Sequence, residues 1–340
     1  MSKRADLQGI RAFAVAMVIA YHLDARLLPG GFIGVDVFFV LSGFLITQVI
    51  YGELSHNGTM NVMAFWTRRI KRLLPNALLT LGAILLASWL LMPAYRWPVI
   101  AWDVGSAAVF LSNFHFADSA VDYFRFDDPP GPVLHFWSLS IEEQFYVALP
   151  ILLVAVAAFK RRLHLCVNLT LGAIAAISFA ASLYIMKTDQ AAAFFHTEAR
   201  VWQLAAGGLL GINFASRNRI PAVLRGACVW IGAALIGYAA FVFHDSLAYP
   251  GFYALVPTLG TLALLLGLDS GTLARPVQGL LSLRLLGWLG DRSYSLYLWH
   301  WPIIVFSQIW RPLDAQGIVL ALIAIPAVSS AAYTILERPI

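Results

Sequence analysis

Apolar residues occur along this chain in long runs that few polar positions interrupt. The runs are about 20 residues long, the length that an α-helix needs to cross the hydrocarbon core of a bilayer. Strands of a membrane barrel would instead alternate in polarity over segments of about ten residues. The pattern predicts ten spanning helices, near residues 7–25, 31–50, 73–92, 136–158, 163–186, 197–214, 222–243, 251–268, 291–309 and 317–336.

The composition indicates an all-α integral membrane protein. Hydrophobic residues make up 60% of the chain, charged residues 12%, and the mean hydropathy is +0.75. So few polar side chains cannot cover the surface of a soluble domain. The net charge of +5 is what basic residues at the ends of spans would give, and it does not indicate nucleic-acid binding. Cys166 and Cys228 have no metal-ligand or CxxC spacing and are expected to be packing residues.

The segment 98–117 decides the orientation of everything after it. It is long enough to cross but contains Asp103, Asn113 and His115. If it does not cross and the N-terminus is cytoplasmic, the basic clusters SKR, RRIKR, KRR and SRNR all fall on the cytoplasmic side, where such residues are enriched. We therefore predict a re-entrant or interfacial segment here. It would lead into an outer loop at 118–135 that covers an outward-facing opening.

The first predicted span contains two ionisable residues, Arg11 and His22. They are eleven residues apart, so a turn of 100° per residue places them on one helical face, about 16 Å apart along the axis. Ionisable groups inside a span are costly and are therefore functional candidates. The structural alternative is an arginine that reaches the inner interface and a histidine bonded to a neighbouring helix.

The second predicted span, GGFIGVDVFFVLSGFLIT at 30–47, carries Asp36 near its outer end and Ser42 beside a glycine. In one interpretation it forms a tightly packed hairpin, in which Asp36 pairs with a cation. In the other, Asp36 or a glutamate orients a neutral His22 and stabilises its protonated form. Ser42 could then donate a hydrogen bond to a developing oxyanion.

A dense basic run, FWTRRIKRLLP at 65–75, precedes the third predicted span. Such runs are typical of stop-transfer signals. Arginine also offers planar donors that suit phosphate, and Arg69 and Arg72 are three residues apart on one helical face. With Arg68 they are candidates for holding an anion. Pro75 is compatible with a break that lets this turn lie across a pore mouth.

Two further stretches place polar groups in predicted spans. HFWSLSIEEQFY contains Ser138, Glu142, Glu143 and Tyr146. Adjacent helical residues point about 100° apart, so we expect at most one glutamate to face a given pore. EARVWQLAAGG and DRSYSLYLWHWP add Arg200, Gln203, Tyr294, Tyr297 and His300. An aromatic belt at the interface is the structural alternative for the last of these.

Five of these motifs occur in an order that resembles one known family. The R-x10-H of the first span, GVDVFFVLSGFLI, the RxxR of RRIKRLLP, FWSLSIEEQFY and SYSLYLWHWPI are similar to the motifs of the integral-membrane acyltransferase-3 family. This family includes O-antigen acetylases and other bacterial glycan O-acyltransferases. The resemblance covers essentially the whole chain.

The resemblance implies an enzyme in the bacterial cytoplasmic (inner) membrane, with about ten helices around a central pore. The donor would be cytoplasmic acyl-CoA, by default acetyl-CoA, and the acceptor a hydroxyl of an extracytoplasmic glycan such as O-antigen. These two and membrane lipid are the expected partners, and no metal is expected. Residues 1–340 would form one membrane acyltransferase domain. Relatives that carry a further helix and a soluble esterase-like domain place them after a motif like the final LERPI.

The resemblance also implies roles for individual residues. His22 matches the essential histidine, as general base or acyl-relay nucleophile, with Asp36, Glu142 and Glu143 as its catalytic partners. The expected donor-binding residues are Arg11, Arg68, Arg69 and Arg72. The expected substrate-binding residues are Ser42, Ser138, Tyr146, Arg200 and His300. Gln203 stands where the family usually has glutamate, so no charge-dependent role is carried over to it.

A transporter or channel is the competing class. It would use the charges within the spans as a substrate or proton path. Such a protein predicts internal repeat symmetry between two halves, and we find no convincing repeat in this sequence.

Overall fold

The computed structural model describes residues 4–123, 131–157, 162–310 and 313–338, and all regular structure within these ranges is helical. The α-helices are α1 (Ala5–Leu23), α2 (Gly34–Asn57), α3 (Val62–Leu91), α4 (Trp97–Ala108), α5 (Ser112–Tyr123), α6 (Phe136–Ala157), α7 (Leu163–Thr188), α8 (Gln190–Phe195), α9 (Thr197–Asn213), α10 (Ala222–Val242), α11 (Leu255–Gly267), α12 (Arg275–Leu281), α13 (Arg284–Asp291), α14 (Ser293–Trp310) and α15 (Ala315–Ala332). A π-helical turn, Tyr333–Glu337, continues α15.

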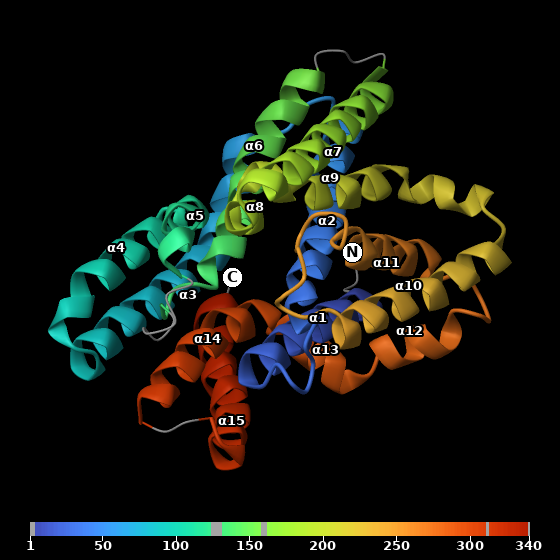
Figure 1. Cartoon of the computed structure of the whole chain (residues 1–340). Helices are drawn as coiled ribbons and strands as arrows, with labels where there is room; N and C mark the ends of the chain where they lie inside the picture. The colour runs from blue at the N-terminus through green and yellow to red at the C-terminus, as the bar shows by residue number, and fades with distance from the viewer. Residues whose placement is uncertain (1–3, 124–130, 158–161, 311–312, 339–340) are drawn as a thin grey trace.

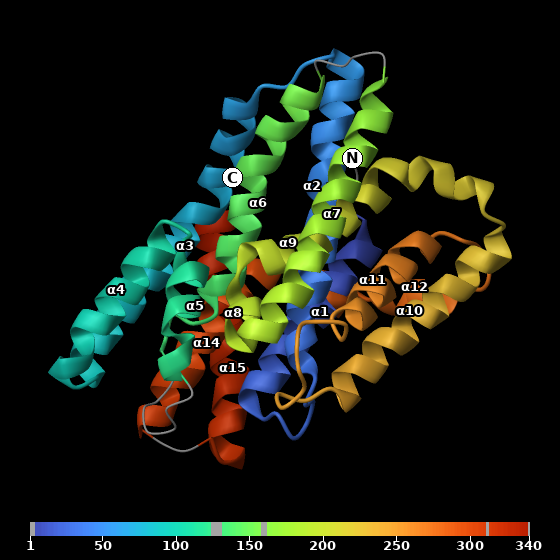
Figure 2. The ribbon, with the colours of Figure 1, turned by 45° about the horizontal axis from the view of Figure 1, so that its top comes forward.

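Helices α1 and α2 lie at the centre of the molecule, between α3 to α5 on one side and α10 to α12 on the other (Figures 1 and 2). Helix α2 packs along α9, which also packs against α7, while α10 packs against α11. Helix α1 contacts α13 and α14. Residues from both ends of the chain therefore meet in the middle of the fold.

Six helical segments in the described ranges are long and apolar enough to cross a membrane, judged by length and composition. They are Gly31–Asn57, Val62–Leu91, Phe136–Val156, Leu163–Thr188, Ala222–Val242 and Ala315–Glu337. These six candidate spans coincide with six of the ten predicted ones. The other four predicted spans correspond to α1, α9, α11 and α14, which are helical but shorter or less apolar. Their crossing stays a prediction, as does the cytoplasmic N-terminus.

The segment 98–117 does not form one helix of spanning length. It is divided between α4 and α5, which have 12 residues each and are joined by a turn in which Phe110 has a positive φ of 55°. A helix of 12 residues is about 18 Å long, well short of the hydrocarbon thickness. The structure therefore agrees with a segment that does not cross as a single span. Of the predicted outer loop at 118–135, residues 118–123 belong to α5 and residues 124–130 lie outside the described residues.

The basic run belongs to a spanning helix, which begins 11 residues earlier than the sequence pattern indicated. Helix α3 starts at Val62, where the Asn61 side chain caps it by accepting a hydrogen bond from the Ala64 amide at 2.9 Å. The helix continues through Pro75 to Leu91, so the break with which this proline is compatible does not occur. Near this proline the Tyr294 hydroxyl of α14 donates a hydrogen bond to the Leu73 carbonyl at 3.1 Å.

Glycine residues allow the backbones of α2 and α9 to pack in direct contact. A Cβ atom built on Gly43 would lie 1.9 Å from the carbonyl oxygen of Leu204, and one on Gly207 would lie 2.0 Å from that of Val40. Close approach of this kind through small residues is a common way for helices to associate in membranes. It fixes α9, and with it Arg200, against the central helix α2.

Candidate active site

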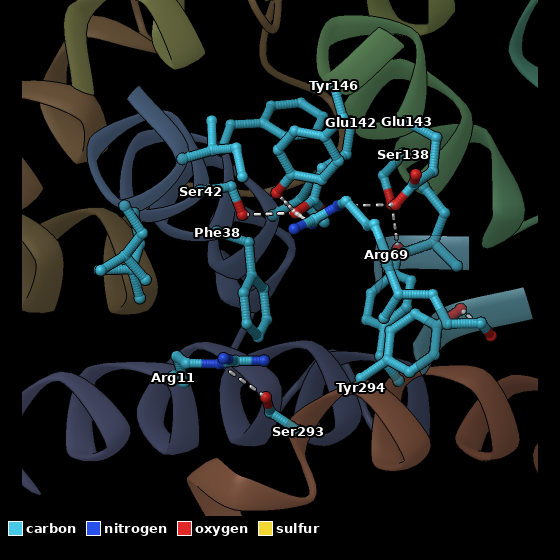
Figure 3. A pocket seen from close by; sticks show the side chains of 18 of the residues that line it. Arg11, Phe38, Ser42, Arg69, Ser138, Glu142, Glu143, Tyr146, Ser293 and Tyr294 are labelled. Carbon is cyan, nitrogen blue, oxygen red and sulfur yellow. Dashed lines mark hydrogen bonds and ion pairs between the residues drawn. The ribbon is translucent and has the colours of Figure 1, made fainter. Parts of the chain in front are cut away.

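A cavity of about 240 Å3 lies between α1, α2, α3, α6 and α14 (Figure 3). Eight of the predicted site residues line it: Arg11, Ser42, Arg69, Arg72, Ser138, Glu142, Glu143 and Tyr146. Tyr294, Tyr297 and Ser293 of α14 complete its polar lining. Four separate sequence motifs therefore contribute to one site, three of which had polar residues inside predicted spans.

Glu142 is the centre of the hydrogen bonding in this cavity. Its Oε1 atom accepts a hydrogen bond from the Ser42 hydroxyl at 2.5 Å and another from the Tyr146 hydroxyl. Tyr146 lies one helical turn beyond Glu142 on α6, whereas Ser42 comes from α2. Both hydroxyl protons are directed at the carboxylate, so in this state neither is offered to an oxyanion.

Arg69 reaches from α3 toward both glutamates. Its Nη2 atom is 4.0 Å from Glu142 Oε1, its Nε atom is 3.7 Å from Glu143 Oε1, and its guanidinium lies 3.4 Å from the centre of the Tyr146 ring. Glu142 and Glu143 both line the cavity, so the expectation that at most one would face it is wrong. The cavity wraps around the start of α6, and one guanidinium bridges the angle between the two side chains.

The other predicted arginines of the donor site differ in position. Arg11 lines the cavity and donates from Nε to the Ser293 hydroxyl at 3.0 Å. Arg72 lines the cavity and is exposed to solvent. Arg68 is also exposed, but it is not among the residues of the cavity wall. The pair with i, i+3 spacing, Arg69 and Arg72, therefore faces the cavity together, as the helical pattern predicted.

Tyr297 connects the cavity to a second polar region. Its hydroxyl donates to the His135 carbonyl at 3.1 Å and accepts a hydrogen bond from Ser138 at 2.5 Å. The edge of its ring meets the ring of Phe38, which projects into the cavity (Figure 3). Behind Tyr297 lies the histidine predicted to carry the chemistry.

His22 does not line the cavity, but it lies in a cluster of three imidazoles. Its Nδ1 atom is 3.1 Å from Nε2 of His300, the ring centroids are 5.2 Å apart and the ring planes differ by 22°, so the two rings meet edge to edge. The His135 ring is 5.6 Å from that of His300, measured between centroids. Within the described ranges, no group of three or more histidine, cysteine, aspartate or glutamate side chains is arranged to hold a metal ion.

A proline in α14 leaves a backbone carbonyl free to accept a hydrogen bond from His135. Pro302 lacks an amide hydrogen, so the carbonyl of Leu298, four residues earlier, receives no helical hydrogen bond from it. His135 Nε2 is 2.9 Å from that carbonyl oxygen and donates to it. The sequence analysis did not single out His135. The available signal was its position at the start of the HFWSLSIEEQFY motif, but nothing in the pattern paired it with α14.

Asp36 and Arg200 form a separate buried pair. Arg200 Nη2 is 3.2 Å from Asp36 Oδ1, and the side chains are each only 1% exposed. Gln203 also donates to Asp36 Oδ1. The structure thus favours the interpretation in which Asp36 pairs with a cation, while His300, and not Asp36, is the partner of His22.

Four aromatic rings surround the Arg200 guanidinium. Their centres lie between 5.5 and 5.8 Å from it, and they belong to Phe39, Trp137, Phe194 and Tyr249. Such a cage stabilises a cation through the negative faces of the rings. The arrangement fixes α2, α6 and α9 to one another, and it explains how a complete guanidinium can be buried.

Comparison with known proteins identifies the family. A family model described as an acyltransferase domain matches residues 4–337, almost the whole chain. The chain belongs to the acyltransferase-3 family. This finding does not favour the competing transporter interpretation, and it confirms the resemblance on which the candidate residues were chosen.

Several relatives of known name are similar over nearly the full chain. YrhL of Bacillus subtilis is 33% identical over 98% of this chain and 54% of its own length. The peptidoglycan O-acetyltransferase OatA of Listeria monocytogenes is 31% identical over 98% and 55%, and O-acetyltransferase OatA of Staphylococcus aureus is 30% identical over 98% and 56%. The chain thus spans little more than half the length of these relatives. No solved structure matches it.

Family motifs did not reveal a second polar cluster beside the cavity. Glu337 is buried and accepts hydrogen bonds from Asn76 Nδ2, at 2.7 Å, and from the Ser295 hydroxyl. The terminal LERPI was considered only as a boundary, so this role was missed. The signal was a glutamate in the last apolar run, where an ionisable group is costly unless it has partners.

Proposed function

We propose that this multi-pass membrane protein is an O-acetyltransferase that moves an acetyl group from cytoplasmic acetyl-CoA to a hydroxyl of a glycan outside the bacterial cytoplasmic membrane. The names of the relatives support O-acetylation and favour peptidoglycan as the acceptor over the O-antigen expected from the sequence motifs. No finding supports an O-antigen acceptor, so peptidoglycan is the acceptor in this proposal.

One observation carries the proposal: α1 connects an arginine-lined cavity with a cluster of imidazoles. Arg11 is in the cavity wall, and His22, eleven residues further along the same helix, contacts His300. Both residues face α14, where their partners are Ser293 and His300. The helical rise between the two levels of α1 is about 16 Å, a distance that the extended pantetheine arm of coenzyme A could cover.

The cationic residues of the cavity suit the phosphates of the donor. Arg72 is exposed and has its guanidinium available at the wall, whereas Arg69 is already engaged by two glutamates. Arg72 would therefore be the main phosphate-binding residue. Arg69 would partly neutralise the two glutamates in the wall beside it. Arg11 lies further along the route toward His22. Tyr297 lines the cavity, and its ring also meets that of His300, so the acyl end of the donor would pass beside Tyr297.

His22 would act as general base in direct transfer. Its unprotonated ring nitrogen takes the proton from the glycan hydroxyl while the hydroxyl oxygen forms a bond to the acetyl carbon. The carbon–sulfur bond of the thioester then breaks, and the thiolate takes the proton from the imidazolium. The products are the O-acetyl glycan and free coenzyme A, with His22 returned to its neutral form.

A two-step relay would begin from the same lone pair. His22 attacks the acetyl carbon, the thiolate leaves, and an acetyl-imidazole forms. The released thiolate takes up a proton from water. The glycan hydroxyl then attacks the acetyl carbon, the carbon–nitrogen bond breaks, and the hydroxyl proton passes by way of the freed imidazole to water. This route does not need donor and acceptor to be bound at the same time. A burst of coenzyme A release without acceptor would distinguish it from direct transfer.

Acetyl transfer from acetyl-CoA to a peptidoglycan fragment, measured with purified protein in nanodiscs, tests the proposal. We expect His22→Ala to bind acetyl-CoA but to transfer no acetyl group. Arg72→Ala should raise the Kd for acetyl-CoA about tenfold, since it removes one charge-assisted phosphate contact. Lys71→Ala is the matched control, because Lys71 is an exposed cation in the same run and lies outside the cavity wall.

Two results would contradict the proposal. One is acetyl transfer by His22→Ala at the rate of the unmodified protein. The other is equal donor binding by the Arg72→Ala and unmodified proteins, which would remove the cavity from the donor site. Acetyl transfer to an O-antigen fragment, with none to the peptidoglycan fragment, would contradict the choice of acceptor but not the acetyltransferase activity.

A further inference from the structure

His300 was expected to contact substrate, but its hydrogen bonds give it a different role. Its Nδ1 atom is 2.6 Å from the carbonyl oxygen of Tyr297, one turn earlier on α14. A carbonyl oxygen only accepts hydrogen bonds, so Nδ1 of His300 carries the hydrogen. His300 is fully buried, and no carboxylate makes a contact with it within the described ranges. An imidazolium there would be a buried charge without a counter-ion, so the neutral ring is the stable form.

The tautomer of His300 determines that of His22. A neutral ring that carries its hydrogen on Nδ1 has a lone pair on Nε2. The Nε2 atom of His300 lies 3.1 Å from His22 Nδ1, so it accepts and His22 Nδ1 donates. Neutral His22 then has its own lone pair on Nε2. The Tyr297 carbonyl thus sets the tautomer of His300, and His300 in turn sets that of His22. The hydrogen of His22 lies on Nδ1, away from the lone pair on Nε2.

Packing fixes the orientation of the same ring. The centre of the Trp301 ring lies 4.6 Å from that of His22, and the centre of the His300 ring lies 5.2 Å from it with the two imidazole planes 22° apart. His22 is nevertheless only partly buried, so its ring keeps an accessible edge. Seven residues earlier, Ser293 on α14 holds Arg11. One face of α14 therefore positions both ionisable residues of α1.

We propose that His300 is a positioning residue for His22: it holds the hydrogen of His22 on Nδ1 and so leaves Nε2 as the basic, reactive atom. This inference rests on the proposed acetyl transfer, for which either the base or the nucleophile must be an unprotonated nitrogen. In a Ser-His-Asp triad, a carboxylate holds the hydrogen of the histidine in place. His300 does the same for His22 without placing a negative charge in the membrane.

Two readouts test the inference, and only one of them depends on activity. The first is the 15N NMR signal of His22 in protein with labelled histidine in lipid, assigned by its loss in His22→Ala. We expect protonated Nδ1 and unprotonated Nε2 in the unmodified protein. His300→Leu should lose this state because no acceptor remains. His300→Gln should keep it, since the glutamine amide oxygen can accept from Nδ1. His164→Leu, which removes an exposed histidine on α7, should leave it unchanged.

The second readout is acetyl transfer by the same variants. His300→Leu should lower kcat about tenfold or more, a part of what a general base contributes, while the KM for acetyl-CoA stays the same. His300→Gln should recover most of the lost kcat. Gel filtration and Tm show whether each variant is folded, and His300→Gln keeps the test decisive if His300→Leu is not.

The outcomes separate this inference from the proposed function. An unchanged His22 tautomer in His300→Leu would overturn the positioning role, whatever the activity. A tautomer that changes as expected, in a protein that transfers no acetyl group, would support the positioning role and contradict the acetyltransferase. A parallel fall in kcat for His300→Leu and His300→Gln, with the tautomer kept in the second, would show that His300 acts on substrate directly and would overturn the inference.

Discussion

The guanidinium of Arg69 lies 3.4 Å from the centre of the Tyr146 ring while it faces Glu142 and Glu143. An arginine of the predicted anion clamp is thus neutralised by two carboxylates of another motif in the same cavity. Cation–π contact and ion pairing act on one side chain, which makes Arg69 the link between α3 and α6. Its removal would leave two glutamates side by side without a counter-charge.

We therefore predict that Arg69→Ala lowers the stability of the protein by about 2 kcal/mol, less than the loss from a fully buried pair because the three side chains are partly exposed. The double variant Arg69→Ala/Glu143→Gln should regain part of this loss, because it removes one of the two like charges. Thermal unfolding in detergent measures both. Equal Tm values for Arg69→Ala and for the exposed control Lys71→Ala would contradict this structural role.

The two adjacent glutamates should differ in importance. Glu142 accepts two hydroxyl hydrogen bonds and lies 4.0 Å from Arg69, whereas Glu143, among the described residues, contacts Arg69 at 3.7 Å without a hydroxyl partner. Glu142→Gln should lower both Tm and acetyl transfer, because a neutral amide is a weaker acceptor for the Ser42 and Tyr146 hydroxyls. Glu143→Gln is the isosteric control and should have the smaller effect. The reverse order of the two variants would assign the dominant role to Glu143.

Asp36 and Arg200 should show strong coupling in a double-mutant cycle. Arg200→Met leaves a buried carboxylate without its cation, which typically costs about 3–5 kcal/mol, and Asp36→Leu leaves the buried guanidinium unpaired. The double variant should be much more stable than the sum of the single effects predicts, because it leaves no unpaired charge. Chemical unfolding followed by tryptophan fluorescence gives the coupling energy. Additive effects would show that the aromatic cage alone stabilises Arg200.

Helical periodicity predicted the contacts within single elements well. Arg11 and His22 do face one neighbour, α14, and Arg69 and Arg72 share the cavity wall. Such relations depend only on 100° per residue and need no knowledge of the partner. That 98–117 does not form one spanning helix agrees with its polar residues and with the distribution of the basic clusters.

Contacts between distant elements could not be obtained in this way. Nothing in the sequence pattern selects His300 rather than Asp36 as the partner of His22, since α14 and α2 carry equally suitable groups. The choice depends on how helices pack, for which the decisive features are small residues such as Gly43 and the carbonyl freed by Pro302. The continuity of α3 through Pro75 has the same origin, because tertiary packing outweighs the local cost of proline.

Two glycines on α2 provide a matched test of this packing. Gly43→Ala would place a Cβ atom 1.9 Å from the Leu204 carbonyl oxygen, whereas a Cβ atom on Gly52 would meet nothing within 4 Å. The first substitution must push α9 away from α2, at a cost of about 1–3 kcal/mol or more. The second should raise stability by about 0.5–1 kcal/mol, because alanine is the better helix former.

The same displacement should reach the buried ion pair. Arg200 lies on α9 one turn before Leu204, so a shifted helix would lengthen its contact with Asp36 on α2. We expect Gly43→Ala to lower Tm strongly and to reduce acetyl transfer even in the fraction that remains folded, while Gly52→Ala keeps full transfer. Similar Tm values for the two variants would mean that α2 and α9 are not in backbone contact. The α2–α9 contact could not then be what holds Arg200 in register with Asp36.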